Sequence, residues 1–271
     1  MTIPFAILLF IAAILGGTLN AVAGGGTFIT LPSLIFTGVL PINANATSTV
    51  ALWPGTVASI SAYRKELVKQ DRLVLLVLGV TSLIGGVLGA ELLIGTSQST
   101  FVILLPYLLL LATVLFAVST PITTWMRERR TAQRAQQESQ ESAVAVPGKV
   151  TWLRLVVIAC FQLIIAVYGG YFGGGIGILM LATLGLMGME NIHEMNSVKT
   201  LLTALINGVA LVIFIIRGIV EWPQALVMIA GAIIGGYGAA YFARKIDQRF
   251  VRVFVILVGL SMTVYFFVHP G

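Results

Sequence analysis

The sequence predicts an all-α polytopic membrane protein whose helices lie in a lipid bilayer. Apolar residues make up 58% of the chain, charged residues make up only 10%, and the mean hydropathy is +1.01. An ordinary soluble domain is about half apolar and roughly a quarter charged. Apolar stretches also recur along the whole length, so a single signal peptide or anchor does not account for this composition.

The apolar stretches predict about 8–10 transmembrane segments. A bilayer core of about 30 Å needs roughly 20 apolar residues per helix. Stretches of that length lie at 3–23, 44–63, 73–95, 100–120, 152–170, 197–217, 222–243 and 250–268. Two shorter apolar stretches, 27–40 and 175–190, each follow a glycine cluster. We expect broken helices at these clusters; whether the two short stretches cross fully or re-enter stays open.

A strongly polar segment, 126–149, divides the chain into two halves. We expect a first transmembrane repeat over 1–120, a cytoplasmic linker over 121–151 and a second transmembrane repeat over 152–271. Lys and Arg in short loops favour the cytoplasm. Three basic clusters mark that side: Arg64, Lys65, Lys69 and Arg72; Arg127, Arg129, Arg130 and Arg134; and Arg244, Lys245, Arg249 and Arg252. If both short stretches cross, all three clusters fall inside, both termini fall outside, and the two halves are oppositely oriented.

Sequence features recur in the same order in both halves. The first half contains NAVAGGGTFITLP, which starts at Asn20, and the second contains YGGYFGGGIGILM, which starts at Tyr168. A Thr-Ser element follows the first cluster, a Lys-Thr element follows the second, and a glycine-rich helix comes later in each half. Inverted repeats with helices broken at matching places are typical of secondary transporters, whose site lies near the midplane. We therefore predict two inverted-topology repeats with a binding site between them.

These motifs resemble the sulfite exporter TauE/SafE family of anion transporters, over nearly the whole chain apart from the linker. The resemblance rests on the N-x-x-x-GGG-T and T-S elements of the first half and on the glycine cluster and K-T element of the second. It implies a secondary transporter that moves a small sulfur-containing anion, sulfite or an organosulfonate, across the cytoplasmic membrane by alternating access, with proton coupling as an option. The second half departs from the pattern, because Tyr168-Gly-Gly-Tyr171 precedes its cluster where the first half has Asn20.

The candidate substrate site combines backbone N–H groups, hydroxyls, amides and one lysine. Broken helices present free N–H groups and the positive end of the helix dipole, and glycine lets the backbone approach a ligand closely. Helix packing is the alternative role of a glycine, and we favour it for Gly85, Gly89, Gly231 and Gly235. Hydroxyls in membrane helices often bond back to their own backbone, which is their alternative role. The expected substrate-binding residues are Asn20, Gly24, Gly25, Gly26, Thr27, Thr47, Ser48, Gly173, Gly174, Gly175, Lys199, Thr200 and Asn207.

Lys199 has two interpretations on sequence alone. A lysine in the middle of a span costs about 2.5–3.5 kcal/mol on insertion scales, so its presence needs a reason. Its ammonium can pair with the substrate anion. Alternatively, it lies within a turn of the cytoplasmic end and extends to water.

Other functional classes have less support. His193 and His269 are the only histidines, so no metal site of the usual spacing is available and we expect neither an enzyme nor a cofactor. An anion channel remains the alternative, and a membrane-integral enzyme is a weaker one. The formal charge of +6 is concentrated in a few loops, which indicates membrane orientation rather than nucleic-acid binding. The expected partners are a small anionic substrate and the lipid bilayer, with a homo-oligomer as an option.

Overall fold

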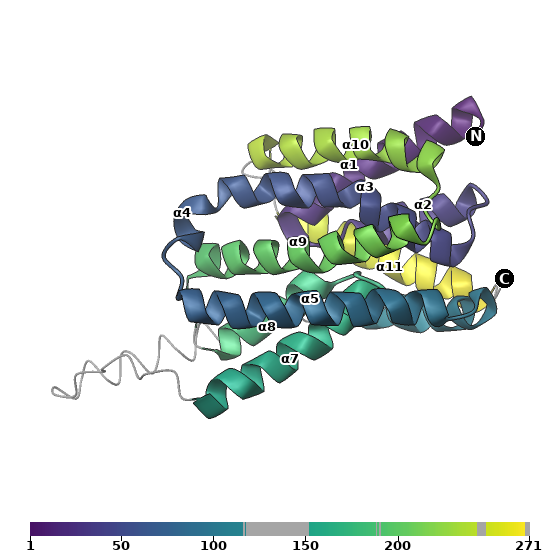
Figure 1. Cartoon of the computed structure of the whole chain (residues 1–271). Helices are drawn as coiled ribbons and strands as arrows, with labels where there is room; N and C mark the ends of the chain where they lie inside the picture. Colours follow the sequence, from purple (N-terminus) through teal and green to yellow (C-terminus); the bar gives the residue numbers. More distant parts are fainter. Residues whose placement is uncertain (116, 118–151, 188, 190, 243–247, 269–271) are drawn as a thin grey trace, which may run out of the picture.

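The computed structural model describes the chain except residues 116, 118–151, 188, 190, 243–247 and 269–271, and the described residues form helices and no strands (Figure 1). The labelled helices are α1 Ile3–Ala23, α2 Thr27–Phe36, α3 Pro41–Ala62, α4 Arg64–Leu67, α5 Arg72–Gly95, α7 Trp152–Tyr171, α8 Ile176–Leu186, α9 Ile192–Ile216, α10 Trp222–Phe242 and α11 Gln248–Val268. A further helix, Gln98–Leu115, carries no label. The predicted all-α class is confirmed. The predicted linker lies outside the described residues.

Local sequence explains where the long helices begin. The side chain of Asp71 caps α5 by accepting a hydrogen bond from the backbone N–H of Leu73 at 2.8 Å. Asn191 caps α9 in the same way, accepting from His193 at 2.9 Å. Such side chains satisfy N–H groups that have no acceptor within the helix. α3 begins at Pro41 instead, where the fixed φ of proline fits the first helical position.

The helices have the length and surface of membrane spans. Four of the described helices are long and apolar enough to cross a bilayer: Ile3–Ala21, Arg72–Gly95, Gln98–Leu115 and His193–Ile216. Shorter apolar helices cover Thr27–Phe36, Leu155–Tyr171, Ile176–Gly185 and Ile256–Val268. Large apolar side chains, among them Leu76, Ile164 and Leu257, are exposed on the outside of the bundle. The polytopic membrane architecture is therefore confirmed, and the number of crossings stays a prediction.

Both glycine clusters interrupt a helix, as predicted. α1 ends where Gly24 adopts a left-handed φ of 76°, and α7 is followed by Gly173 and Gly175 with φ of 76° and 74°. Residues with a Cβ rarely adopt this backbone conformation, which explains why glycine occupies these positions. The helices after the breaks, α2 and α8, have 10 and 11 residues. At about 1.5 Å per residue they reach roughly half of a 30 Å bilayer core, so neither crosses it alone.

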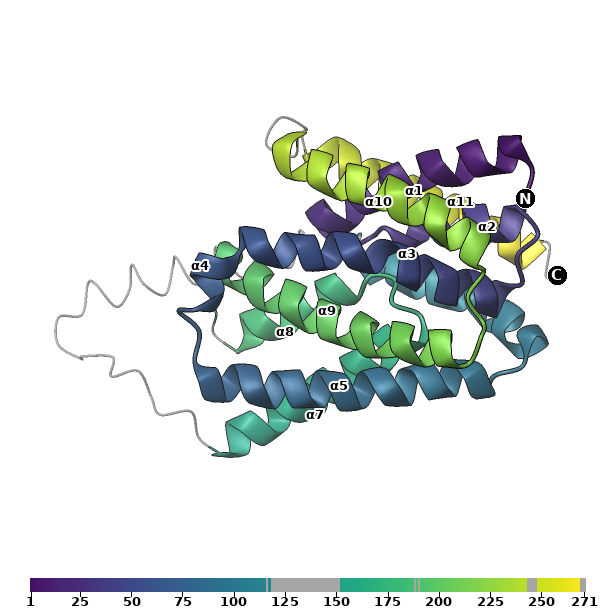
Figure 2. The same ribbon diagram turned by 45° about the horizontal axis from the view of Figure 1, so that its top comes forward.

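Helices of the two halves pair crosswise. α1 packs along α10, and α7 packs along α5, while α3 and α9 pack against each other between these two pairs (Figures 1 and 2). Glycines permit the close approach, because a Cβ on Gly235 would overlap the backbone oxygen of Ile14 and one on Gly89 would overlap that of Val167. A Cβ on Gly85 or Gly231 would likewise be too close to the partner helix. The predicted packing role of these four glycines is confirmed.

The helices α3 and α9, one from each half, run in opposite directions. Near the start of α3, the Thr47 hydroxyl accepts a hydrogen bond from the N–H of Glu221, which follows α9. Further along α3, Trp53 Nε1 donates to the carbonyl of Ala204, so α3 and α9 are antiparallel. α1 and α7 also take corresponding places, since α1 packs on α10 as α7 packs on α5. An inverted repeat would produce this arrangement; the inverted repeat itself remains a prediction.

The ends of the bundle differ in the segments that they carry. The start of α1 and the end of α11 lie at one end of the bundle, and α4 lies at the other (Figures 1 and 2). The first basic cluster, which includes Arg64 and Lys69, belongs to the α4 end. The second basic cluster lies outside the described residues. Which end faces the cytoplasm stays a prediction that depends on the basic residues.

Candidate functional site

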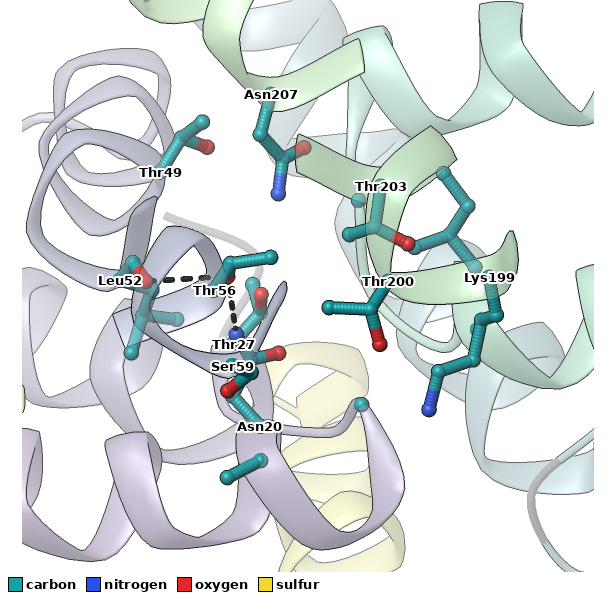
Figure 3. A pocket seen from close by; sticks show the side chains of 15 residues that line it. Asn20, Thr27, Thr49, Leu52, Thr56, Ser59, Lys199, Thr200, Thr203 and Asn207 are labelled. Carbon is teal, nitrogen blue, oxygen red and sulfur yellow. Dashed lines mark hydrogen bonds between the residues drawn. The ribbon is translucent and has the colours of Figure 1, made fainter. Parts of the chain in front are cut away.

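The two helix breaks, one from each half, meet at a small cavity (Figure 3). A side-chain carbon placed on Gly24 would lie 3.6 Å from the Cα of Gly177. The cavity has a volume of about 30 Å³. A water molecule needs about 10–15 Å³ on such a measure, so there is room for about two waters or a ligand of few atoms. The lining residues are Asn20, Ala21, Gly24, Thr27, Thr49, Leu52, Thr56, Ser59, Gly173, Ile176, Gly177, Lys199, Thr200, Thr203 and Asn207.

Both short helices begin at the cavity. Thr27 is the first residue of α2 and Ile176 is the first residue of α8, and both line it. The first N–H groups of a helix have no acceptor within the helix and carry the positive end of its dipole. Such helix ends bind anions readily. The broken helices thus bring backbone donors from both halves to one place, which is the arrangement expected from the sequence.

Lys199 lies in this cavity and not at the water-exposed end of its helix. Its side chain is 7% exposed, and its stem passes Gly177. In the part of the chain that the structure describes, its ammonium forms no ion pair and no hydrogen bond; the ion pair that is present joins Arg217 to Glu91. A buried charge without a partner costs several kcal/mol. The geometry therefore favours pairing with a bound anion over extension to water.

Polar side chains from α3 and α9 face each other across the cavity (Figure 3). Most of their hydroxyl hydrogens are already used: Thr49 donates to the carbonyl of Asn45 at 2.9 Å, and Thr200 donates to that of Asn196 at 2.7 Å. Thr56 accepts from the Asn20 amide at 2.9 Å. These groups shape the cavity and hold its walls together. In this conformation they have little donor capacity left for an anion.

Two lining side chains keep their donors free. Within the described residues, neither the amide of Asn207 nor the hydroxyl of Thr27 makes a hydrogen bond, and both line the cavity. An amide contributes two N–H donors and a hydroxyl contributes one. Together with the Lys199 ammonium and the helix-start N–H groups, they form a set of donors around a space whose described lining residues include no carboxylate.

Thr47 and Ser48 were predicted as substrate ligands, but the structure places them outside the cavity. The Ser48 hydroxyl lies 2.6 Å from that of Thr30, and both side chains are buried. The Thr47 oxygen accepts the hydrogen bond from Glu221, at 3.0 Å. Each hydroxyl therefore ties α3 to a neighbouring segment. Thr49, the next residue along α3, lines the cavity instead.

Four of the predicted glycines also lie outside the cavity. They are Gly25, Gly26, Gly174 and Gly175. A Cβ on Gly26 would stand 3.0 Å from the Cβ of Asn20, and one on Gly175 would stand 3.3 Å from that of Ala112. These two glycines therefore permit close packing at the breaks. Only the first glycine of each cluster, Gly24 or Gly173, reaches the cavity wall.

The remaining predicted residues are brought together, with additions that sequence analysis missed. Asn20, Gly24, Thr27, Gly173, Lys199, Thr200 and Asn207 all line the cavity. The missed polar residues are Thr49, Thr56, Ser59 and Thr203, and Gly177 is a missed glycine. Their signal was a polar stripe at helical spacing in apolar helices. Thr49 and Thr200 are separated in the sequence by the same interval as Thr56 and Asn207, so these residues hold matching positions in the two halves.

Metal chemistry has no candidate site in the described part of the chain, where no three His, Cys, Asp or Glu side chains are grouped to hold an ion. Within the cavity, Lys199 is the one titratable side chain among the described lining residues. The arrangement is therefore suited to holding a small anion by hydrogen bonds and one positive charge.

Comparison with known proteins gives one family. The family model for the sulfite exporter TauE/SafE matches residues 9–266. A "probable membrane transporter protein" of Haemophilus influenzae is 25% identical over 259 residues, which are 94% of this chain and 92% of that protein. YfcA of Escherichia coli, also named a probable membrane transporter protein, is 25% identical over 257 residues, covering 94% and 87% of the two chains. No solved structure matches the chain. Because the family match spans nearly the whole sequence, the chain belongs to the sulfite exporter TauE/SafE family of membrane transporters.

Proposed function

We propose that the protein carries a small sulfur oxyanion, sulfite or an organosulfonate, across the cytoplasmic membrane as a secondary transporter. One observation carries the proposal: Lys199 lies buried, without a partner among the described residues, in a cavity onto which the starts of α2 and α8 open. An anion in this cavity would complete the pairing of the lysine. The family is named for sulfite export, and the matched relatives are named only as membrane transporters.

The donor set suits an oxyanion. Each oxygen of a sulfonate or sulfite group accepts hydrogen bonds, and bonds to a charged partner are roughly twice as strong as neutral ones. Lys199 supplies the charge, while Asn207, Thr27 and the helix-start N–H groups supply neutral donors. A volume of about 30 Å³ suits a ligand with few non-hydrogen atoms. One full charge binds such an anion without holding it so firmly that release becomes slow.

Alternating access is the transport mode that we propose. The cavity lies between α3 and α9, which come from different halves and run antiparallel. Two hydrogen bonds join the halves on the Glu221 side of the site: Asn45 donates to the carbonyl of Tyr171 at 2.9 Å in a buried bond, and Thr47 accepts from Glu221 in a partly buried one. Breaking these bonds would open the site toward the Glu221 end of the bundle. Forming others at the α4 end would close it there. Rocking of one repeat against the other is the usual route in such transporters.

Counterflow in proteoliposomes tests the proposal. Vesicles loaded with unlabelled sulfite should accumulate labelled sulfite above its equilibrium level for a time, because a carrier exchanges substrate across a closed gate. An anion channel, the alternative function, would equilibrate the label without an overshoot. Repeating the uptake with an imposed proton gradient shows whether protons are coupled. Absence of uptake for sulfite and for simple organosulfonates alike would contradict the proposed substrate class.

A further inference from the structure

The described lining of the cavity carries a single full charge. Among its described lining residues, Lys199 is cationic, and the others are glycines, hydroxyl and amide side chains and three apolar residues. The ion pair that the described residues form, Arg217 with Glu91, is exposed and does not line the cavity. Any ligand in the cavity is therefore balanced by one positive charge.

The helix ends at the breaks add little net charge. Gly24, which caps the end of α1, lines the same cavity as Thr27, which starts α2. In the second half, Gly173 follows the end of α7, and Ile176 starts α8. A helix start and a helix end carry partial charges of opposite sign, about half an elementary charge each. At each break the two partial charges largely cancel. The N–H groups at the helix starts therefore act as short-range hydrogen-bond donors and not as a second charge.

The other half does not supply a matching cation. The sequence interval between Thr49 and Thr200 also separates Ser48 from Lys199. Ser48 therefore holds the position in the first half that corresponds to Lys199 in the second. Ser48 is neutral and is bonded to Thr30 outside the cavity. The two halves thus line one cavity with similar hydroxyl residues, but among the described lining residues only the second half contributes a charge.

From this charge balance we infer that the site selects monovalent over divalent oxyanions and that Lys199 sets this limit. The inference rests on the proposed function of the cavity as the substrate site. A monoanion leaves the occupied cavity neutral. A dianion leaves one uncompensated negative charge in a small space between apolar helices, and an unpaired charge there costs several kcal/mol. Hydrogensulfite and alkylsulfonates would then be transported in preference to sulfite dianion and sulfate.

Methanesulfonate and sulfate test the inference, because they have the same number of non-hydrogen atoms around sulfur and differ by one charge. Binding of each to the full-length protein in detergent is measured by calorimetry at one fixed pH and ionic strength. We expect the affinity for methanesulfonate to exceed that for sulfate at least tenfold. Perchlorate, a monoanion with the shape of sulfate, controls for the methyl group and should also bind more tightly than sulfate.

A second charge placed in the cavity gives the reciprocal test. Asn207 lies two turns beyond Lys199 on the cavity face of α9 and has no hydrogen-bond partner among the described residues. Asn207→Lys should shift the ratio of the two affinities toward sulfate at least tenfold. The neutral control, Asn207→Met, should weaken both anions and leave their ratio unchanged.

The outcomes separate the inference from the proposed function. If the wild-type protein binds both anions equally, or sulfate more tightly, the inference is wrong and the cavity still binds sulfur oxyanions. If neither sulfite nor any of these anions binds, the result contradicts the proposed function itself and not only the charge selectivity. A ratio that favours methanesulfonate but does not respond to Asn207→Lys would assign the selectivity to another site and overturn the role of Lys199. The wild-type comparison is decisive even if the lysine variant does not fold.

Discussion

Gly177 and Lys199 lie side by side at the wall of the cavity: a side-chain carbon on Gly177 would stand 3.2 Å from Cδ of Lys199. Gly177 belongs to α8, directly after the second break, and Lys199 belongs to α9. The absence of a side chain at position 177 therefore leaves the space through which the lysine reaches the cavity. A contact of this length requires the lysine stem to move by a few tenths of an ångström once a methyl group is added.

Gly177→Ala should consequently weaken anion binding without unfolding the protein. Because the displaced atoms belong to a flexible stem, we expect a loss of affinity of roughly fivefold, about 1 kcal/mol, and little change in melting temperature. Calorimetry and thermal unfolding in detergent measure the two effects. Gly79→Ala is the control, since the added carbon would meet only Leu205 Cδ1 at an ordinary 3.5 Å. Equal affinity in both variants would show that Gly177 does not position the lysine.

The packing glycines should respond in the opposite manner. A Cβ on Gly235 would lie 2.8 Å from the carbonyl carbon of Ile14 and still closer to its oxygen, and backbone atoms cannot turn aside. Gly235→Val should therefore lower the free energy of unfolding by about 1–3 kcal/mol or more, the usual range for overpacking. Gly238→Val, one turn along α10, serves as the control, because a Cβ there would meet no described atom within 4 Å. Similar melting temperatures for the two variants would contradict the close α1–α10 contact.

The positions of the helix breaks could be predicted from sequence because their cause is local. A left-handed φ at Gly24 and Gly173 favours glycine, so runs of glycine after an apolar span indicate the break directly. The individual glycines that face the ligand could not be predicted in the same way. Gly175 packs on Ala112 of a distant helix, and this contact exists only after both halves have folded.

The hydroxyl residues show the same limit. Thr47, Ser48 and Thr49 are similar in sequence, yet they face Glu221, Thr30 and the cavity respectively. Successive residues on a helix point about 100° apart, so the three hydroxyls meet different neighbours. The folded positions of α2 and of the segment before α10 decide which hydroxyl is left to face the cavity. For Lys199, the sequence left two interpretations, and burial beside Gly177 favours the site.

The membrane orientation can be tested with single cysteines in a variant in which Cys160 is replaced. We expect cysteines at Lys69, near the α4 end, and at Gln137, in the linker, to be protected in intact cells from an impermeant reagent, because basic loops stay in the cytoplasm. Cysteines at Ser99 and Gly271 should be labelled. Labelling of permeabilised cells controls for reactivity. Labelling at Lys69 together with protection at Ser99 would reverse the orientation.

Replacement of Lys199 tests the centre of the site. Lys199→Met keeps the volume of the stem and deletes the charge, so anion affinity should fall at least tenfold, about 1.4 kcal/mol. Lys199→Arg should recover only part of this affinity, because a planar guanidinium differs in shape from an ammonium. Without anion, the Met variant should melt at the same temperature as the wild type or higher, since a buried cation with no partner among the described residues is removed. With saturating methanesulfonate, the wild type should gain thermal stability and the Met variant should not, because only bound ligand stabilises the fold. Unchanged affinity in the Met variant would remove Lys199 from the site and leave recognition to the backbone N–H groups, Asn207 and Thr27.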